Sequence, residues 1–563
     1  MRLMRSVAPS VAWMPASPTA PWIIPRVRGL GRVGRIAVAI VALLALLVMT
    51  AGAVVAGVVG SDDTIVNRPT ALGDDGRPLL TAPDLLAYEG VTVTLRASAP
   101  DGVFIGTAHP VDVADFVGDS PRIRLTSVTR TGVVAEDVGS GKRVQPAGAG
   151  FWTHSMSGSG VEELTLDRDT SAAQWVIAPL TGVGPTTVSF AITVPGVFTW
   201  ALIAFGAGAL VLLACVELLL RTRTRRRRGP RLPSAAERVA AYVPSSERVA
   251  ASRPGGRRKA RRSALVVVLT LSLAGCTIED LLPAKRQSSE TATTKVALTR
   301  SQLPALLESY GDRLRTAIEA ARPPRYREDK WRLADRGPAL ESDLFGTRVG
   351  RLTGLGRRSV PVHDGIEAYS GRFDSYPMWS LVASEVDRET RVDLFTKASV
   401  EAPWFRQAGS TITGDLPEAG RPARLPGGKD AAAATAAWRD YVRSGTEDDR
   451  LEVDRASRKW RDNVADLGSR AMFTGYTVTA RPEGLSRVVE VADGALAIVA
   501  LRVTTRLDGR SDLMVRWAPP YGRYRTSKDG VLSFADLAVG VIHLPARGEP
   551  TILGSTFSEV AAP

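Results

Sequence analysis

The sequence predicts a multidomain membrane protein with transmembrane helices, an extracytoplasmic antiparallel β-sandwich and a tandem α+β module. Three observations lead to this fold class. Two long apolar runs flank a region of short β-type segments, a shorter apolar run follows, and a helix-then-strands order then occurs twice. A chain of 563 residues is long enough for several such domains.

Two apolar runs have the length of membrane spans. Ile36–Gly60 holds 25 residues without a charge, and Val197–Leu220 holds 24 residues with a single acidic residue, Glu217. At about 1.5 Å per residue, each helix exceeds the roughly 30 Å of a bilayer's hydrocarbon core. A buried core helix is the alternative interpretation of either run.

A third run, Ser263–Gly275, has only 13 residues and follows a cluster of basic residues at 257–262. This is the pattern of a signal peptide, and a short third transmembrane helix is the alternative. The run ends in Leu-Ala-Gly-Cys at Cys276, a string that resembles the lipobox of bacterial lipoproteins. The resemblance implies that diacylglycerol is attached to Cys276 and that the chain is cut just before it. Because 262 residues precede the run, the chain resembles a membrane protein fused to a lipoprotein precursor.

The positive charge of the chain is concentrated in two segments. The net charge is +14, from 72 Lys and Arg against 58 Asp and Glu. Residues 1–35 contain six arginines and no acidic residue, and residues 221–262 contain 15 basic residues and two glutamates, so the rest of the chain is net negative. Basic residues beside membrane spans stay in the cytoplasm, which predicts a multi-pass cell-membrane protein with a cytoplasmic N-terminus and extracytoplasmic main domains.

The arginine block at 221–228 predicts contact with anionic lipid headgroups. A nucleic-acid partner is not expected, because no aromatic residues for base stacking are interleaved with these arginines. Charge, composition and turn signals then divide the chain into predicted segments. These are a disordered N-terminus (1–35), a transmembrane helix (36–60), a β-sandwich (61–196), a transmembrane helix (197–220), a cytoplasmic linker (221–262), the lipobox segment (263–276), a spacer (277–297) and two α+β domains (298–425 and 426–563).

Alternating β-type runs between the two spans predict the antiparallel β-sandwich. The expected strands are 91–97, 103–107, 123–128, 151–155, 175–178 and 186–194. The strings Gly102–Ala108, Val111–Phe116 and Phe151–Gly160 resemble a family of uncharacterised actinobacterial membrane proteins. That resemblance implies a β-domain held outside the membrane between two spans.

The region after Cys276 begins with a helical stripe of apolar residues over Leu298–Ala321, with Ser301 as the expected N-cap and Pro323 as the stop. Strands are expected at 378–386 and 392–400. The string Tyr376-Pro-Met-Trp379 and residues 391–405 resemble an actinobacterial lipoprotein domain of unknown function.

A second cycle follows, with helices expected at 429–444 and 450–467. The strands expected after them are 472–480, a hairpin of 488–491 and 495–505 turned at Asp493-Gly494, and then 512–517, 531–544 and 551–560. Helices leading twice into an antiparallel meander resemble cystatin-like or nuclear-transport-factor-like units, which implies a curved sheet with a concave apolar pocket.

The sequence contains no recognisable catalytic or metal-binding pattern. Two cysteines and four histidines exclude a disulfide scaffold and a cysteine-rich zinc module, and His109, His154, His363 and His543 lack metal-ligand spacing. Gly29–Gly34 has the spelling of a dinucleotide fingerprint, but it leads straight into a membrane span. We therefore expect no catalytic, cofactor-binding or metal-ligating residues, and Cys276 is the one predicted site, for lipid attachment.

Two groups of residues have alternative interpretations. His363 and Asp364 with Glu367 form either a proton-transfer cluster or a solvated turn. The aromatic residues of the lipoprotein-like region line either a pocket or a core; they are Tyr376, Trp379, Trp404 and Phe405.

The predicted function is that of a non-enzymatic, membrane-anchored cell-envelope protein. Its outer domains would bind a partner protein, an envelope polymer or a small ligand. One alternative is an extracytoplasmic enzyme that uses the concave face of the C-terminal module. Another is an accessory subunit of an envelope assembly or transport system.

Overall fold

The computed structural model describes residues 32–83, 85, 91–166, 173–181, 184–227, 293–355, 359–421, 429–510, 526–528 and 530–561. These residues belong to two compact units, one within 1–65 and 193–271 and the other within 66–192 and 272–563. The predictions for the N-terminus before residue 32, the linker after residue 227, and the lipobox segment with Cys276 lie outside the described residues.

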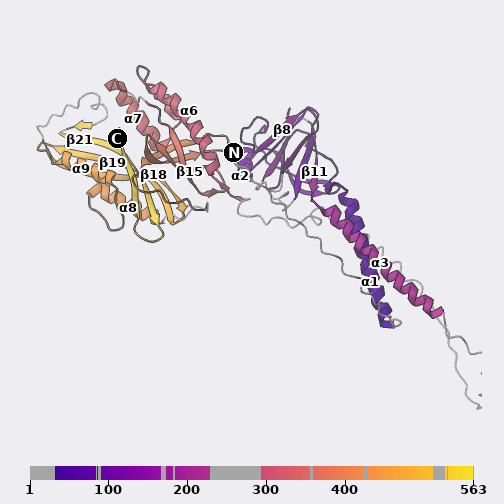
Figure 1. Ribbon diagram of the computed structural model, residues 1–563. Coiled ribbons are helices and arrows are strands. Elements are labelled where there is room, and N and C mark those ends of the chain that lie inside the picture. The colour runs from indigo at the N-terminus through magenta and orange to yellow at the C-terminus, as the bar shows by residue number, and fades with distance from the viewer. Residues whose placement is uncertain are drawn as a thin grey trace, which may run out of the picture. The chain divides into compact units, whose positions relative to one another are not determined.

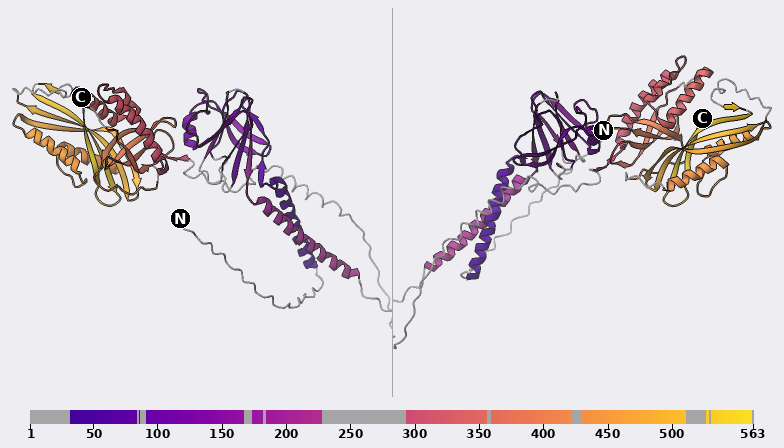
Figure 2. Two further views of the ribbon diagram at one scale, coloured as in Figure 1. Left: turned by 45° about the horizontal axis from the view of Figure 1, so that its top comes forward. Right: turned by 180° about the vertical axis from the view of Figure 1, so that it is seen from behind.

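Two apolar helices, α1 (Arg32–Val59) and α3 (Val197–Arg227), make up most of the first unit, with the short strand β1 (Thr64–Val66) after α1. The stretches Val33–Val59 and Val197–Arg221 are long and apolar enough to cross a membrane. All views show the two helices side by side along most of their length (Figures 1 and 2). Helix α3 continues past its predicted end at Leu220, because arginine is a good helix former.

Buried residues spaced seven apart, most of them small, form the contact between α1 and α3. The buried positions are Ala45, Gly52 and Val59 on α1 and Ala201, Gly208 and Cys215 on α3. A Cβ atom on Gly52 would lie 2.7 Å from the carbonyl oxygen of Ala201, and one on Gly208 would lie 2.9 Å from that of Ala45. The backbones approach this closely only because both glycines lack a side chain, as in helix pairs that associate in lipid.

The carboxylate of Asp63 caps α3. Its Oδ2 accepts a hydrogen bond from the backbone N–H of Gly196 at 2.8 Å, and its Oδ1 accepts one from Phe198 at 2.7 Å. These bonds satisfy amide groups that have no partner inside the helix. The negative charge also interacts favourably with the positive end of the helix dipole.

The β-domain of the second unit contains two sheets. In one, β2 (Thr70–Leu72) and β4 (Thr92–Ser98) pair with β11 (Thr186–Thr193), and β9 (Glu162–Leu166) pairs with β4. The other has the order β7-β6-β3-β10-β5-β8, with bounds Gly132–Val138, Arg122–Thr129, Leu79–Thr81, Gln174–Pro179, Val103–Ala108 and His154–Gly158. Strands overlapping all six predicted runs are present, which confirms the β-rich character of this region.

Two features of the β-domain differ from the prediction. Strands β3 and β6 are parallel rather than antiparallel. The long connection between them allows this, because it returns the chain to the starting end of β3 before β6 begins. That connection includes a helix that the sequence did not reveal, α2 (Pro110–Val117), capped by His109, whose Nδ1 accepts the N–H of Val111. Eight residues are too few to show a helical period. Val113 and Val117 of α2 pack on Leu80 and Val176 of the second sheet.

The C-terminal module consists of two antiparallel sheets. The first has the order β13-β15-β16-β17, with bounds His363–Ser370, Met378–Val386, Glu389–Lys397 and Phe405–Thr411, beside the small pair β12 (Lys295–Val296) and β14 (Arg372–Phe373). The second contains β18 (Phe473–Val491), β19 (Gly494–Gly509), β21 (Val531–Pro545), β22 (Thr551–Val560) and the short β20 (Thr526–Lys528).

The two sheets share one apolar core. Leu381 and Leu394 of the first sheet pack with Leu496 and Ile498 of the second. The intervening residues of β19, Ala497 and Val499 among them, belong to a different core on the opposite face, because side chains alternate along a strand. A central strand is therefore buried on both faces.

Helices cover the outer faces of these sheets. Helix α6 (Leu303–Ala321) packs on the first sheet together with α7 (Gly337–Thr353), and α8 (Lys429–Ser444) packs on the second with α9 (Arg455–Ser469). Figure 1 shows α6 and α7 on one side of the strands and α8 and α9 on the other. The result is a four-layer arrangement of helices, sheet, sheet and helices.

Several predicted boundaries in the module are wrong. A 3₁₀ turn at Arg300–Gln302 precedes α6, with a capping box between Thr299 and Gln302 in place of a cap at Ser301. Strand β18 is continuous across the predicted break between 480 and 488, because a bulge near Pro482 accommodates the irregular residues. Helix α7 was missed, and its apolar residues are sparse. The predicted strand 512–517 lies outside the described residues.

The glycine contact between α1 and α3 yields the first testable prediction. Replacing Gly208 by Leu should force the helices apart at a cost of about 1–3 kcal/mol, because a side chain there meets the backbone of α1. Cys215, buried one heptad further along α3, should then react faster with N-ethylmaleimide in detergent, measured in a Cys276→Ser background. Gly206→Leu is the matched control, because a Cβ at Gly206 has no atom within 4 Å. Equal labelling rates in the two variants would disprove the close contact.

Candidate functional site

A cavity of about 760 Å³ lies where β15, β16 and β17 of the first sheet meet β18 of the second. Its lining is mostly apolar or aromatic, and includes Met378, Trp379, Ala398, Phe405 and Val488. This size and lining are typical of sites for small organic ligands.

Strand register brings the central lining residues together. Trp379 of β15 pairs with Thr396 of β16, and Thr396 pairs in turn with Phe405 of β17. Residues directly opposite each other on neighbouring strands point to the same face of a sheet. Three strands therefore present Trp379, Thr396 and Phe405 as one continuous wall. From the second sheet, the consecutive residues Ser486, Arg487 and Val488 of β18 complete the site.

The cavity carries positive charge. Among the described residues that line it, Arg336 and Arg487 are basic and none is acidic. The Arg336 guanidinium stacks 3.7 Å from the centre of the Phe405 ring and donates to the backbone carbonyl of Asp335 at 2.7 Å. Burial, together with repulsion from Arg332, lowers the pKa of Arg336, yet a guanidinium stays protonated in proteins. The arrangement suits an anionic group attached to an apolar body.

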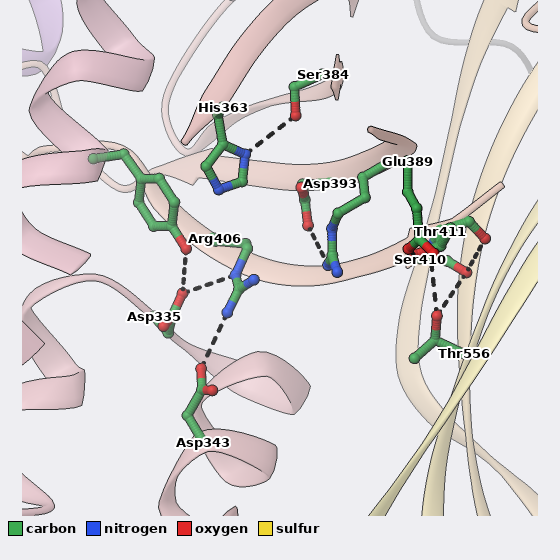
Figure 3. A network of polar contacts seen from close by, with 12 residues as sticks. Asp335, Asp343, His363, Ser384, Glu389, Asp393, Arg406, Ser410, Thr411 and Thr556 are labelled. Atoms are coloured by element: carbon green, nitrogen blue, oxygen red, sulfur yellow. Dashed lines mark hydrogen bonds and ion pairs between the residues drawn. The ribbon is translucent and has the colours of Figure 1, made fainter. Parts of the chain in front are cut away.

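A network of buried charges lies near this cavity, between the first sheet and its helices. Arg406 of β17 pairs with both Asp335 and Asp343 (Figure 3). Its Nε lies 2.9 Å from Asp335 Oδ1, and its Nη2 lies 3.0 Å from Asp343 Oδ2. The hydroxyl of Tyr310 on α6 donates to Asp335 at 3.2 Å, and Arg391 pairs with Asp393 at 3.2 Å. The contacts of Arg406 and Tyr310 thereby tie α6 and α7 to β17, whereas the Arg391–Asp393 pair lies within β16.

Burial sets the protonation of these groups. It raises the pKa of Asp335 to about 7, because desolvation and the nearby charge of Asp343 outweigh the attraction of Arg406. Asp393 is buried too, but the positive charges of Arg391 and Arg406 overcome that effect and lower its pKa. Three carboxyl groups therefore share two guanidinium groups, and partial protonation of Asp335 near neutral pH reduces the excess negative charge.

A histidine and a serine form the one pair in this network that resembles catalytic machinery. His363 Nδ1 lies 3.1 Å from Ser384 Oγ, and burial lowers the pKa of His363 (Figure 3). Ser384 is fully buried, so its hydroxyl is out of reach of a substrate. His363, Asp364 and Glu367, for which a proton-transfer cluster was one of two interpretations, do not converge, because Asp364 is exposed and Glu367 faces Arg300 at 3.7 Å.

The structure separates the aromatic residues that the sequence left open between pocket and core. Trp379 and Phe405 line the cavity, and Trp379 also belongs to the core between the two sheets, whereas Tyr376 and Trp404 pack beside a small apolar cluster with Met378. The four histidines lie on separate elements, and no cluster of three metal-ligating side chains occurs among the described residues. Cys276 lies outside those residues, and Cys215 is a free thiol inside α3.

Sequence reasoning missed the arginines of both sites. Arg336 stands at the start of α7, which was not predicted, and Arg406 sits in a strand that was not predicted. The available signal for a buried ion pair was an arginine two positions before an apolar residue, as at Arg406 and Ala408, because residues two apart in a strand point to the same face. No protein-family model matches this chain, and no curated protein has a significantly similar sequence.

The buried ion pairs predict a large asymmetry between two arginines. Arg406→Met should destabilise the protein by about 3–5 kcal/mol, because it leaves buried carboxylates without their counter-charge. Arg506→Met should cost less than about 1 kcal/mol, because the Arg506–Asp508 pair is more than one-third exposed on both sides. Chemical unfolding of the full chain in detergent, followed by near-UV circular dichroism, measures both changes. Similar losses in the two variants would contradict the structural role of the network.

Proposed function

We propose that this protein is a non-enzymatic, membrane-anchored binding protein of the cell envelope, whose C-terminal module takes up a small amphipathic anion. The cavity between the two sheets carries this proposal, because its apolar wall and two arginines match a ligand with an apolar body and an acidic group. The buried position of Ser384 favours binding over hydrolysis at the histidine nearby.

Membrane anchoring is supported by the two apolar helices. Besides the small residues of their contact, α1 and α3 expose many large apolar side chains, among them Ile36, Ile40, Leu43, Trp200, Leu202 and Leu210. Water would make such a surface unfavourable, whereas lipid tails would cover it. Arginines precede α1 and follow α3 in the sequence, and basic residues beside membrane spans stay in the cytoplasm. This charge supports an orientation with residues 61–196 and the C-terminal module outside.

Acylation of Cys276 would give the C-terminal module an anchor of its own. Growing cells with an alkyne fatty acid should label the C-terminal part, and Cys276→Ala should abolish that label because it removes the acceptor thiol. Cys215→Ala is the matched control, since Cys215 lies inside a membrane helix and should not be modified. Equal labelling of the wild type and Cys276→Ala would exclude the lipoprotein interpretation.

Binding can be tested with a pair of probes that differ in charge. The full chain in detergent should be stabilised by 1-naphthyl phosphate more than by 1-naphthol, because only the phosphate can pair with Arg336 and Arg487. At about 100 times its Kd, a ligand adds about 2.7 kcal/mol to the free energy of unfolding. Thermal unfolding reports the shift.

The arginine variants make this test specific. Arg487→Met should remove most of the advantage of the phosphate over the alcohol. Arg506→Met should leave that advantage unchanged, because Arg506 is exposed and lies outside the cavity. Equal stabilisation by both probes would contradict an anion site. Steady release of fluorescent 1-naphthol from the phosphate ester would favour the enzymatic alternative instead.

A further inference from the structure

Helix α2 of the β-domain contacts the C-terminal module through a buried carboxylate. Asp112 Oδ2 lies 2.6 Å from Lys295 Nζ, and Asp112 Oδ1 accepts a hydrogen bond from the hydroxyl of Tyr376 at 2.7 Å. The side chain of Asp112 is only 7% exposed. Residues of the C-terminal module satisfy both of its oxygen atoms. A carboxylate buried in this way is stable only while its partners stay in place.

A second carboxylate on the same helix adds to the contact. Asp115 Oδ2 accepts a hydrogen bond at 2.7 Å from the backbone N–H of Val400, in the loop after β16. Asp112 and Asp115 are three residues apart, and therefore lie on one face of α2. Lys397 at the end of β16 is close enough to Lys295 and to both carboxylates for their charges to influence its pKa, which burial lowers. An acidic helix face thus meets a basic edge of the module.

An apolar patch supports these polar contacts. Val111 of α2 packs with Ala297 and Met378, which are all nearly or fully buried, and Tyr376 borders the patch. Apolar burial at the centre with paired charges around it is the usual composition of a specific protein interface. The described residues of 66–192 and 272–563 also belong to one compact unit.

We propose that α2 is a docking element that holds the C-terminal module on the β-domain without help from the covalent connection through residues 228–292. The partner of α2 is thus the lipoprotein-like part of the same chain, recognised through Lys295, Tyr376 and the apolar patch. Cleavage of the chain before Cys276 would leave two products that remain together. The interface also adjoins the ligand cavity, because Met378 belongs to both the patch and the cavity lining.

The test separates the two parts covalently and asks whether they stay together. A specific protease site is inserted between Pro283 and Ser288 of the full chain, after the third apolar run, so that the released C-terminal fragment contains no membrane segment. The chain is bound in detergent through an N-terminal tag and cut on the resin. The C-terminal fragment should stay bound, and its dissociation rate is measured during washing.

Variants on both sides of the contact identify the interface. Asp112→Asn and Tyr376→Phe should each speed dissociation by about tenfold or more, because the first removes the charge that pairs with Lys295 and the second removes the hydroxyl that donates to Asp112. Asp137→Asn is the matched control, because that carboxylate pairs with Arg77 inside the β-domain. Immediate release of the wild-type fragment would overturn the proposal, as would dissociation of both interface variants at the wild-type rate.

Discussion

The C-terminal module depends on burying both faces of a single strand. Along β19, Leu496 and Ile498 face the first sheet, and Ala497 and Val499 face α8 and α9. Such a strand is stable only if a layer covers each face, because exposed apolar surface costs about 25 cal/mol per Å². This requirement makes the two sheets pack face to face, and the cavity forms at the end of their contact, where Trp379 and Arg487 approach from opposite sheets.

Buried charge plays a different role from apolar packing in this module. The apolar core brings the layers together without specifying their alignment, because hydrophobic attraction has no direction. The ion pairs of Arg406 with Asp335 and Asp343 are directional, and they connect β17 to residues on either side of the start of α7. Arg336 is the neighbour of Asp335 in the chain, so the alignment that satisfies the network also sets the position of a cavity residue.

Much of the secondary structure was predictable from local patterns. The bounds of β15, β22 and α8 equal those predicted, because their apolar residues recur regularly and because β15 ends at a turn and α8 at a glycine. Helix α2 and helix α7 were missed, since one is short and the other has few apolar residues on its buried face. The sequence predicts a break where β18 has a bulge, because a proline within a run of strand residues is typical of both.

The sequence by itself determined the features that depend on neighbours along the chain: two membrane-length apolar helices, the charge that flanks them, the strand alternation and the lipobox-like string at Cys276. Tertiary structure alone decided which distant residues meet. Asp112 and Tyr376 are 264 positions apart, and Asp335 and Arg406 are 71 apart. The residues next to a charged residue in the chain do not identify its partner, because an ion pair depends on distance in space. That distance is set by how the layers pack.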